Sequence, residues 1–164
     1  MTRIILSTAL ALTLAAGPAL ALSCLPSDLA RTYHQAAEAE EVYVVVTGRL
    51  IFDEGKLPVV DYNNQQNTPQ NTFIPARLTG QSLTLNGFDT GFDQEITLNA
   101  KCFGPWCASP VSDVSYMAFL ERRATGYMLD LDPCGGMAFP EPSAALQEEV
   151  LQCFQGGPCE PDEQ

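Results

Sequence analysis

The residues of this sequence that could do chemistry are mainly cysteines. There are six: Cys24, Cys102, Cys107, Cys134, Cys153 and Cys159. An even number of cysteines behind a secretion signal is typical of disulfides rather than metal ligands. Sequence alone does not choose among the many pairings that six cysteines allow. The short spacings across Gly104-Pro105 and Gly156-Gly157-Pro158 make two local disulfides reasonable, Cys102 with Cys107 and Cys153 with Cys159.

Residues suited to enzymatic catalysis are few. His34 is the single histidine, and its spacing suggests no catalytic partner, so we interpret it as an exposed or rim residue of the expected helix. The chain lacks the HExxH zinc motif, the nucleophile elbow and the glycine-rich phosphate loop. We therefore expect a protein that is not an enzyme and that needs no cofactor.

The closest pair of carboxylates is Asp130 and Asp132, which alternation places on the solvent-facing side of one strand. Calcium takes about six to eight oxygen ligands, so two carboxylates are too few for it. A solvated strand face explains this pair better than a weak calcium site does, and we expect no bound metal.

Residues 1–21 have the pattern of a secretory signal peptide. Arg3 supplies the positive charge, residues 4–14 are the apolar segment, and Ala19-Leu20-Ala21 fits a small-x-small cleavage site. A second candidate cleavage site ends at residue 23, directly before the first cysteine. We expect a periplasmic or secreted protein, and no later stretch is long enough to span a bilayer.

The chain is strongly acidic, with a formal net charge of -12. This charge argues against nucleic acid and anionic membranes as partners, since both carry negative charge themselves. Residues 22–159 have the length of a single domain, which we expect to be a monomer, and residues 160–164 form an acidic tail.

The clearest predicted element is a β-hairpin in residues 116–131, closed by a polar turn that contains Gly126. Both faces of its first strand are apolar, so we expect this strand to be central and buried. The second strand turns Tyr127, Leu129 and Leu131 inward and Asp130 and Asp132 outward. Cys134 then follows, in a position to tie the end of the hairpin to a distant segment.

Residues 42–52 form the strongest predicted strand, and its internal Gly48 is typical of a small barrel whose first strand coils around two sheets. The remaining pattern predicts short strands at 57–60, 73–79, 82–85 and 94–102, with Pro75 in an edge position. Phe88 and Phe92 are expected in turns, and residues 61–72 are expected to form a mobile polar loop. Two helices are predicted, at 28–39 and 143–154.

Phe103 and Trp106 lie inside the predicted loop between Cys102 and Cys107. These aromatic side chains could form an exposed contact surface, or they could plug the end of a barrel. We favour the plug.

Several features follow one another in a recognisable order: a Cys-x-Pro start at Cys24, a valine-rich long strand, a cysteine before the hairpin, the hairpin itself, and a closing helix that ends at Cys153. This order covers most of residues 24–153 and resembles the superfamily of netrin modules and tissue inhibitors of metalloproteinases, in particular its small bacterial exported members. The resemblance implies a mainly β fold: a five-stranded OB-fold-like Greek-key barrel with an N-terminal and a C-terminal flanking helix, stabilised by disulfides.

In the inhibitors of that superfamily, the first cysteine is the mature N-terminus, and its amine and carbonyl chelate the zinc of the protease. The resemblance makes Cys24 the matching residue, with Leu25, Pro26 and Ser27 as the wedge that follows it. This chain departs from the pattern because it has one cysteine there instead of a Cys-x-Cys pair. Cleavage after residue 21 would also leave two residues ahead of Cys24 and remove the chelating amine.

The resemblance also bears on the long disulfide. In the family pattern the N-terminal segment is tied to the cysteine that ends the hairpin, which here pairs Cys24 with Cys134; the same pair remains once the two local disulfides form. The inhibitor branch of the family favours Cys24 with Cys102 instead.

We thus expect an exported, disulfide-stabilised OB-fold interaction module that binds a protein or small ligand through its loops and N-terminal edge. The alternative is a metalloprotease inhibitor that acts through Cys24, Leu25, Pro26 and Ser27. The sequence does not identify the partner.

Overall fold

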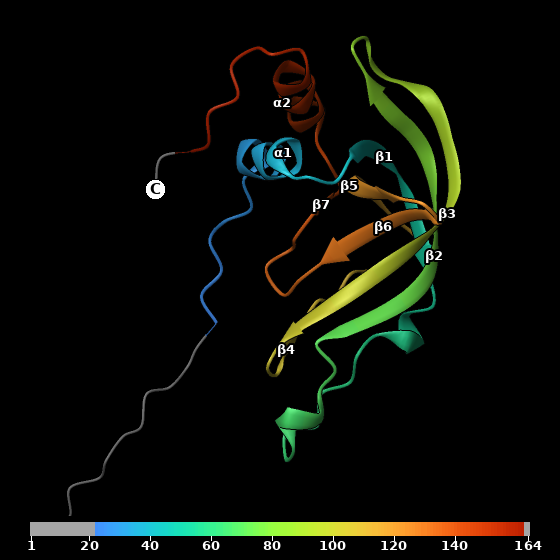
Figure 1. Ribbon diagram of the computed structural model, residues 1–164, viewed down its shortest axis with the longest axis vertical. Coiled ribbons are helices and arrows are strands. Elements are labelled where there is room, and N and C mark those ends of the chain that lie inside the picture. Colours follow the sequence, from blue (N-terminus) through green and yellow to red (C-terminus); the bar gives the residue numbers. More distant parts are fainter. Residues whose placement is uncertain (1–21, 163–164) are drawn as a thin grey trace, which may run out of the picture.

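The computed structural model describes residues 22–162 of the chain (Figure 1). The predicted signal peptide, residues 1–21, and the last two residues of the acidic tail lie outside this part. Neither helix within residues 22–162 has the length and apolar character needed to cross a membrane.

The described part is mainly β, with two α-helices and two short 3₁₀ turns. The strands are β1 (Tyr43–Phe52), β2 (Asn71–Thr84), β3 (Gly87–Phe103), β4 (Trp106–Cys107), β5 (Val114–Arg123), β6 (Gly126–Leu131) and β7 (Ala138–Pro140). The helices are α1 (Leu29–Glu38) and α2 (Ala144–Phe154), and the 3₁₀ turns are η1 (Glu54–Lys56) and η2 (Gln65–Asn67).

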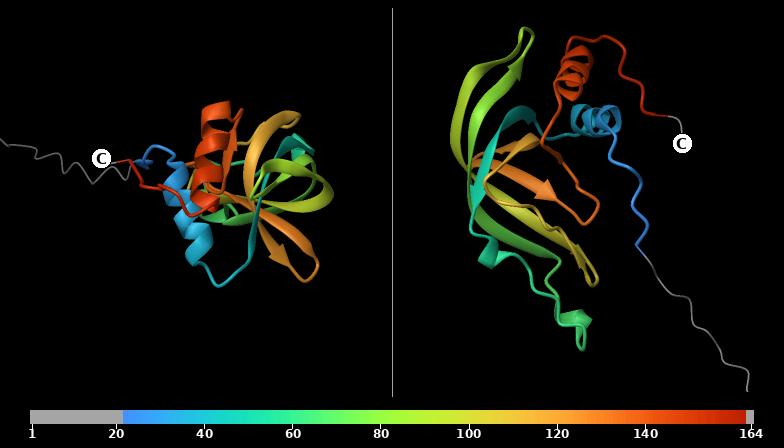
Figure 2. Two further views of the ribbon diagram at one scale, coloured as in Figure 1. Left: turned by 90° about the horizontal axis from the view of Figure 1, so that it is seen from above. Right: turned by 180° about the vertical axis from the view of Figure 1, so that it is seen from behind.

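Five of the strands pair in a closed ring. β1 pairs with both β2 and β5, β3 pairs antiparallel with β2 and parallel with β6, and β6 returns to β5. The short β7 adds to β5, and β4 adds to the end of β3. The two helices flank this ring and pack against each other at one end of the sheet (Figure 2). The mainly β, OB-fold-like architecture with flanking helices is therefore confirmed.

The first strand of the predicted hairpin, β5, runs through the centre of the molecule. Its residues 116–120 are buried on both faces, and the side chains of Met117, Phe119 and Leu120 are almost completely enclosed. β1 covers one edge of β5, and β6 and β7 share the other edge. The apolar residues on both faces of this strand therefore form the middle of the core, as predicted.

Gly48 allows β1 to coil, because it lies directly opposite Gly80 of β2. A Cβ atom on Gly48 would overlap the backbone oxygen of Thr79, and a Cβ on Gly80 would lie 2.5 Å from the Cα of Gly48. The two strands therefore approach more closely here than any side chain permits. The role predicted for the internal glycine of β1 is confirmed.

The long β2–β3 hairpin differs from the prediction. Separate short strands were expected at 73–79, 82–85 and 94–102, but the two strands pair continuously through a single register shift near Ser82, and only residues 85 and 86 form the turn. Phe88 and Phe92 consequently lie in β3 rather than in turns. Continuous pairing with β2 overrides the local turn preference of the glycines beside these two aromatic residues.

The expected strand at 57–60 does not form, because no strand edge pairs with it and Pro58 removes one backbone donor. The polar tract after it contains the single turn η2, and β2 begins at Asn71.

Both helices start at the predicted positions. The carboxylate of Asp28 accepts a hydrogen bond of 2.8 Å from the backbone N–H of Arg31, and the Ser143 hydroxyl accepts one of 3.1 Å from the N–H of Leu146. These side chains satisfy backbone donors that a helix start leaves unpaired.

Three disulfides link the described cysteines. They join Cys24 to Cys134, Cys102 to Cys107 and Cys153 to Cys159. These are the three pairs expected above, and the rival pair of Cys24 with Cys102 does not form. The first of them ties the segment before α1 to the loop after β6.

Candidate functional site

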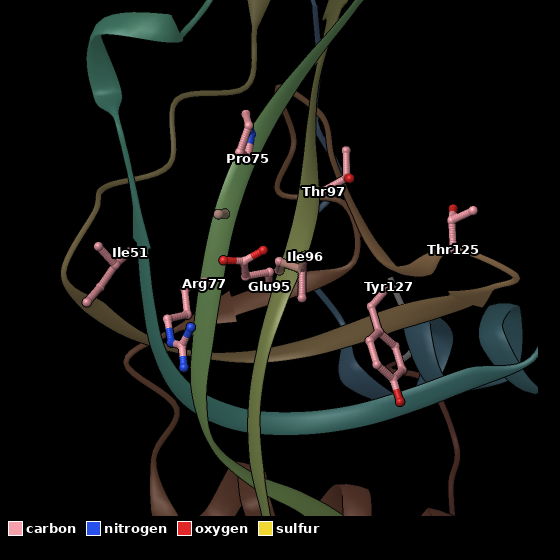
Figure 3. Close-up of a pocket in the computed structure, with 9 residues that line it drawn as sticks. Ile51, Pro75, Arg77, Glu95, Ile96, Thr97, Thr125 and Tyr127 are labelled. Carbon is pink, nitrogen blue, oxygen red and sulfur yellow. The ribbon is translucent and has the colours of Figure 1, made fainter.

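A groove of about 520 Å³ crosses the outside of the barrel where four strands and one turn meet (Figure 3). We call it the sheet groove. Its lining residues come from the end of β1, from adjacent positions of β2 and β3, and from the β5–β6 turn and the start of β6: Ile51, Pro75, Ala76, Arg77, Glu95, Ile96, Thr97, Thr125 and Tyr127.

Strand register brings these residues together. Arg77 of β2 lies between Ile51 of β1 and Glu95 of β3, and Pro75 lies beside Thr97. The pairing of β1 with β2 stops at Ala76, so Pro75, the residue before Ala76 in the chain, has no partner on β1. Pro75 therefore has β3 on one side only, which agrees with its predicted edge position and leaves one end of the groove open.

The charges of the groove are arranged around Arg77. Its Nη2 lies 2.8 Å from Oδ2 of Asp93, whose Oδ1 accepts a 2.9 Å hydrogen bond from Thr79. The hydrogen bond from Arg77 lowers the pKa of Asp93, and the same bond raises the pKa of Arg77. Arg77 is therefore held in place with its charge largely balanced, while Glu95 lies opposite it on β3.

Tyr127 supplies an aromatic wall. Its ring meets that of Phe92 edge to face, with ring centres 5.2 Å apart, so its position is fixed by packing. Hydroxyls of Thr97 and Thr125 face the same groove (Figure 3). This lining can hold a ligand by hydrogen bonds and stacking, and its residues include no nucleophile with an adjacent base.

His34 lies on α1, away from the sheet groove. Its Nε2 is 2.8 Å from the carbonyl oxygen of Cys159, and its Nδ1 is 4.0 Å from Glu38. These contacts tie the C-terminal segment to the helix, and neither partner is a nucleophile.

Asp130 of β6 and Asp132, which follows the end of that strand, do not form the solvated face that was expected. Oδ2 of Asp130 lies 2.6 Å from Nζ of Lys101. Its Oδ1 accepts a 2.9 Å hydrogen bond from the side-chain amide of Asn99, a residue that is only 3% exposed. Asp132 accepts a hydrogen bond from the backbone N–H of Cys134. Within residues 22–162, no group of three or more histidine, cysteine or acidic side chains could hold a metal ion. The partners of Asp130 lie on β3, and the sequence pattern gave no signal for them.

The prediction that Phe103 and Trp106 plug the barrel is wrong. The two residues face each other across the small hairpin closed by Cys102 and Cys107, and they are 46% and 39% exposed. The disulfide holds this hairpin beyond the end of the ring, where little of the core remains for the aromatic rings to cover.

The predicted binding edge, residues 24–27, lies away from the sheet groove. Cys24 is joined to Cys134, Leu25 is 62% exposed, and Pro26 and Ser27 are also exposed. None of these four residues lines the sheet groove. The structure thus separates the predicted edge from the groove, which sequence reasoning missed although Pro75 and the Thr125-Gly126 turn were visible signals of an edge and a bend.

No protein-family model, curated protein or solved structure matches this chain.

Proposed function

We propose that this protein is an exported binding module that holds a protein segment or a small ligand in the sheet groove. The observation that supports the proposal most is the place of the groove: it lies on the second and third strands of the ring, beside the end of the first strand and the turn between the last two. OB-folds bind ligands on this face, together with the loop that joins their last two strands. This likeness is an analogy at the level of the fold.

Two further observations support the proposal. Three disulfides are typical of proteins that work in an oxidising, exported environment, which agrees with the signal peptide expected in residues 1–21. The groove offers hydroxyls, an aromatic ring and a balanced arginine rather than a basic surface. We therefore propose a ligand other than nucleic acid, and a role in binding rather than catalysis.

The test is a pair of matched variants on one strand. Thr97→Arg places a long side chain in the groove, and Thr90→Arg places the same side chain at an exposed position of β3 outside it. Wild-type mature protein is used to capture partners from the exported fraction of its own cells. The proposal requires a specific partner that the first variant loses and the second keeps. Capture that Thr97→Arg leaves unchanged would show that the groove is not the binding site.

A second candidate function is inhibition of a metalloprotease through Cys24. The observation in its favour is the exposed segment of Leu25, Pro26 and Ser27, held at one end by the Cys24–Cys134 disulfide. The absence of a Cys24–Cys102 link does not favour it. Mass spectrometry of the mature N-terminus decides: a chain that begins at Cys24 and inhibits a zinc protease supports this function, and a chain that begins at Leu22 opposes it.

A further inference from the structure

A second groove lies between the helices and the barrel, at the start of β1, whereas the sheet groove lies at the end of that strand. We call it the helix groove. It has a volume of about 500 Å³, within the range of small-molecule sites. Its floor consists of the buried side chains of Ala36, Val45, Leu83 and Phe119. The floor is thus apolar and is made by α1, β1, β2 and β5 together.

Large apolar side chains around this groove remain open to solvent. Val42 is 61% exposed and Phe154 is 41% exposed, although both line the groove. Leu85 is also exposed, and its carbonyl accepts a 2.8 Å hydrogen bond from Gln155, the residue next to Phe154. Leu85 does not line the groove, but Val42 and Phe154 expose apolar surface beside its apolar floor, and exposed apolar surface of this kind marks a binding site.

The mouth of the helix groove is acidic. Glu40 and Glu41 line it and are exposed, and Glu38 lies one turn away at the end of α1. Burial raises the pKa of Tyr43, which also lines the groove, and the carboxylate of Glu121 raises it further. Arg123 is paired with Glu121 at 2.7 Å, and Arg122, whose backbone N–H bonds to the carbonyl of Val42, is a single cation near the three carboxylates of Glu38, Glu40 and Glu41. A cationic group is therefore favoured at the mouth.

We propose that the helix groove binds a small cationic amphiphile, with its apolar chain on the floor and its positively charged head at Glu40 and Glu41. Charge complementarity selects this class over neutral and anionic amphiphiles, and the apolar floor selects it over simple cations. The site is separate from the sheet groove, since the two share no lining residue. It does not depend on the proposed function of that groove.

The test titrates the mature, oxidised protein with three probes that share a decyl chain, each below its critical micelle concentration: decyltrimethylammonium, decyl maltoside and decyl sulfate. Isothermal titration calorimetry should show the cationic probe binding about fivefold more tightly than the neutral one, and the anionic probe most weakly. The preference for the cation should shrink as salt is added, because exposed charges are screened. Equal affinity for the cationic and anionic probes, or no binding of the cationic one, would overturn the proposal.

Matched variants locate the binding. Ala37→Trp fills the helix groove from an exposed position of α1, and Ala145→Trp adds the same ring at an exposed position of α2 outside it. The first variant should lose the cationic probe and the second should keep it, with unchanged thermal unfolding in both. Binding that survives Ala37→Trp would place the probe elsewhere and contradict the assignment.

A second pair of variants tests the charges. Glu40→Gln with Glu41→Gln should bring the cationic and neutral probes to similar affinity, while Glu148→Gln, an exposed residue of α2 outside the groove, should change nothing. A basic peptide that binds this groove when the amphiphile does not would show that the occupant is a protein segment, and would overturn the assignment to a small ligand.

Discussion

The sheet groove and the helix groove are held together by different forces. The strands that carry the sheet groove, β1, β2, β3 and β6, are joined by strand pairing, with Arg77 placed between Ile51 and Glu95 by backbone register. The helix groove is bordered by α1, α2 and β1, and backbone pairing does not join the two helices to the barrel. The Cys24–Cys134 disulfide ties the segment before α1 to the loop after β6, whereas Cys153–Cys159 joins the end of α2 only to the C-terminal segment.

This difference indicates which contacts each groove needs in order to keep its shape. Strand pairing fixes the sheet groove as long as the barrel is folded. The helix groove additionally needs the helices to stay docked, and their docking depends on the packing of Leu29, Ala36 and Val150 in the core and on the Cys24–Cys134 disulfide. Loss of those contacts should open the helix groove before it affects the sheet groove.

The largest effect is expected from removing the long disulfide with Cys24→Ala and Cys134→Ala. The disulfide closes a separation of 110 residues, and the chain-entropy model gives about 4.7 kcal/mol of stability for a loop of about this size. Urea unfolding should show a loss approaching that value, and hydrogen exchange should rise in α1 before it rises in β2 and β3. Equal exchange in the barrel and in α1 would contradict the difference between the two regions.

A single methyl group should disturb the barrel itself. Gly80→Ala places a Cβ against the backbone of Thr47 and Gly48, so we expect a loss of about 1–3 kcal/mol or more. Gly91→Ala is the matched control, because nothing lies within 4 Å of its Cβ position. Chemical denaturation measures both. An unchanged stability in Gly80→Ala would mean that β1 and β2 do not cross as closely as the structure has them.

Removing the short disulfide with Cys153→Ala and Cys159→Ala should cost less, about 2 kcal/mol, because the chain-entropy model assigns small stabilisation to short loops. The two cysteines are only 6 residues apart. The C-terminal segment would be released from His34, and the end of α2 should fray while β2 and β3 keep their protection in hydrogen exchange. A destabilisation as large as that from the long disulfide would refute this ranking.

The two local disulfides, the central hairpin, the caps of both helices and the glycine of β1 could be predicted from the sequence, because each depends on spacing or alternation within a short stretch. The long Cys24–Cys134 pair was expected from the family resemblance instead. The sheet groove could not, because it depends on β1 ceasing to pair at Ala76 and on a turn from another hairpin reaching the same place. The cluster of Asn99, Lys101 and Asp130 escaped for the same reason. It joins side chains that lie 31 and 29 residues apart in the sequence.

Capping of α1 should depend on pH. The hydrogen bond from the N–H of Arg31 lowers the pKa of Asp28, although burial opposes it. The ionised side chain therefore stabilises the fold above the unfolded-state pKa of about 3.9, and that stability is lost as the pH falls through the lowered folded-state pKa. Asp28→Asn keeps a cap but removes the charge.

At neutral pH the free energy of unfolding of the wild-type protein should exceed that of the Asp28→Asn variant by less than about 1 kcal/mol, the usual contribution of a charge at a helix start. Urea unfolding at a series of pH values should show this advantage shrinking below about pH 3.9. An advantage that persists unchanged in acid would show that charge is not the cause.

The smallest effect is expected at Glu149 of α2. Burial raises the pKa of this carboxyl, and the nearby carboxylates of Asp28 and Asp162 raise it further. The folded state therefore favours the protonated form, so the ionised form costs stability once the pH rises above the unfolded-state pKa. Glu149→Gln should raise the melting temperature slightly at neutral pH but not in acid, and the neighbouring Glu148→Gln serves as control. A lower melting temperature of the Glu149→Gln variant at neutral pH would contradict the expectation that the ionised Glu149 side chain destabilises the fold.

The central claim is that the sheet groove is the binding surface, and hydrogen–deuterium exchange of the mature protein with and without its captured partner tests it most directly. Protection on binding should concentrate in residues 75–77, 95–97 and 125–127, which line the groove. The Thr97→Arg variant should show no such protection under the same conditions. Protection confined to residues 24–27, with the groove unaffected, would contradict the claim and favour the inhibitor function.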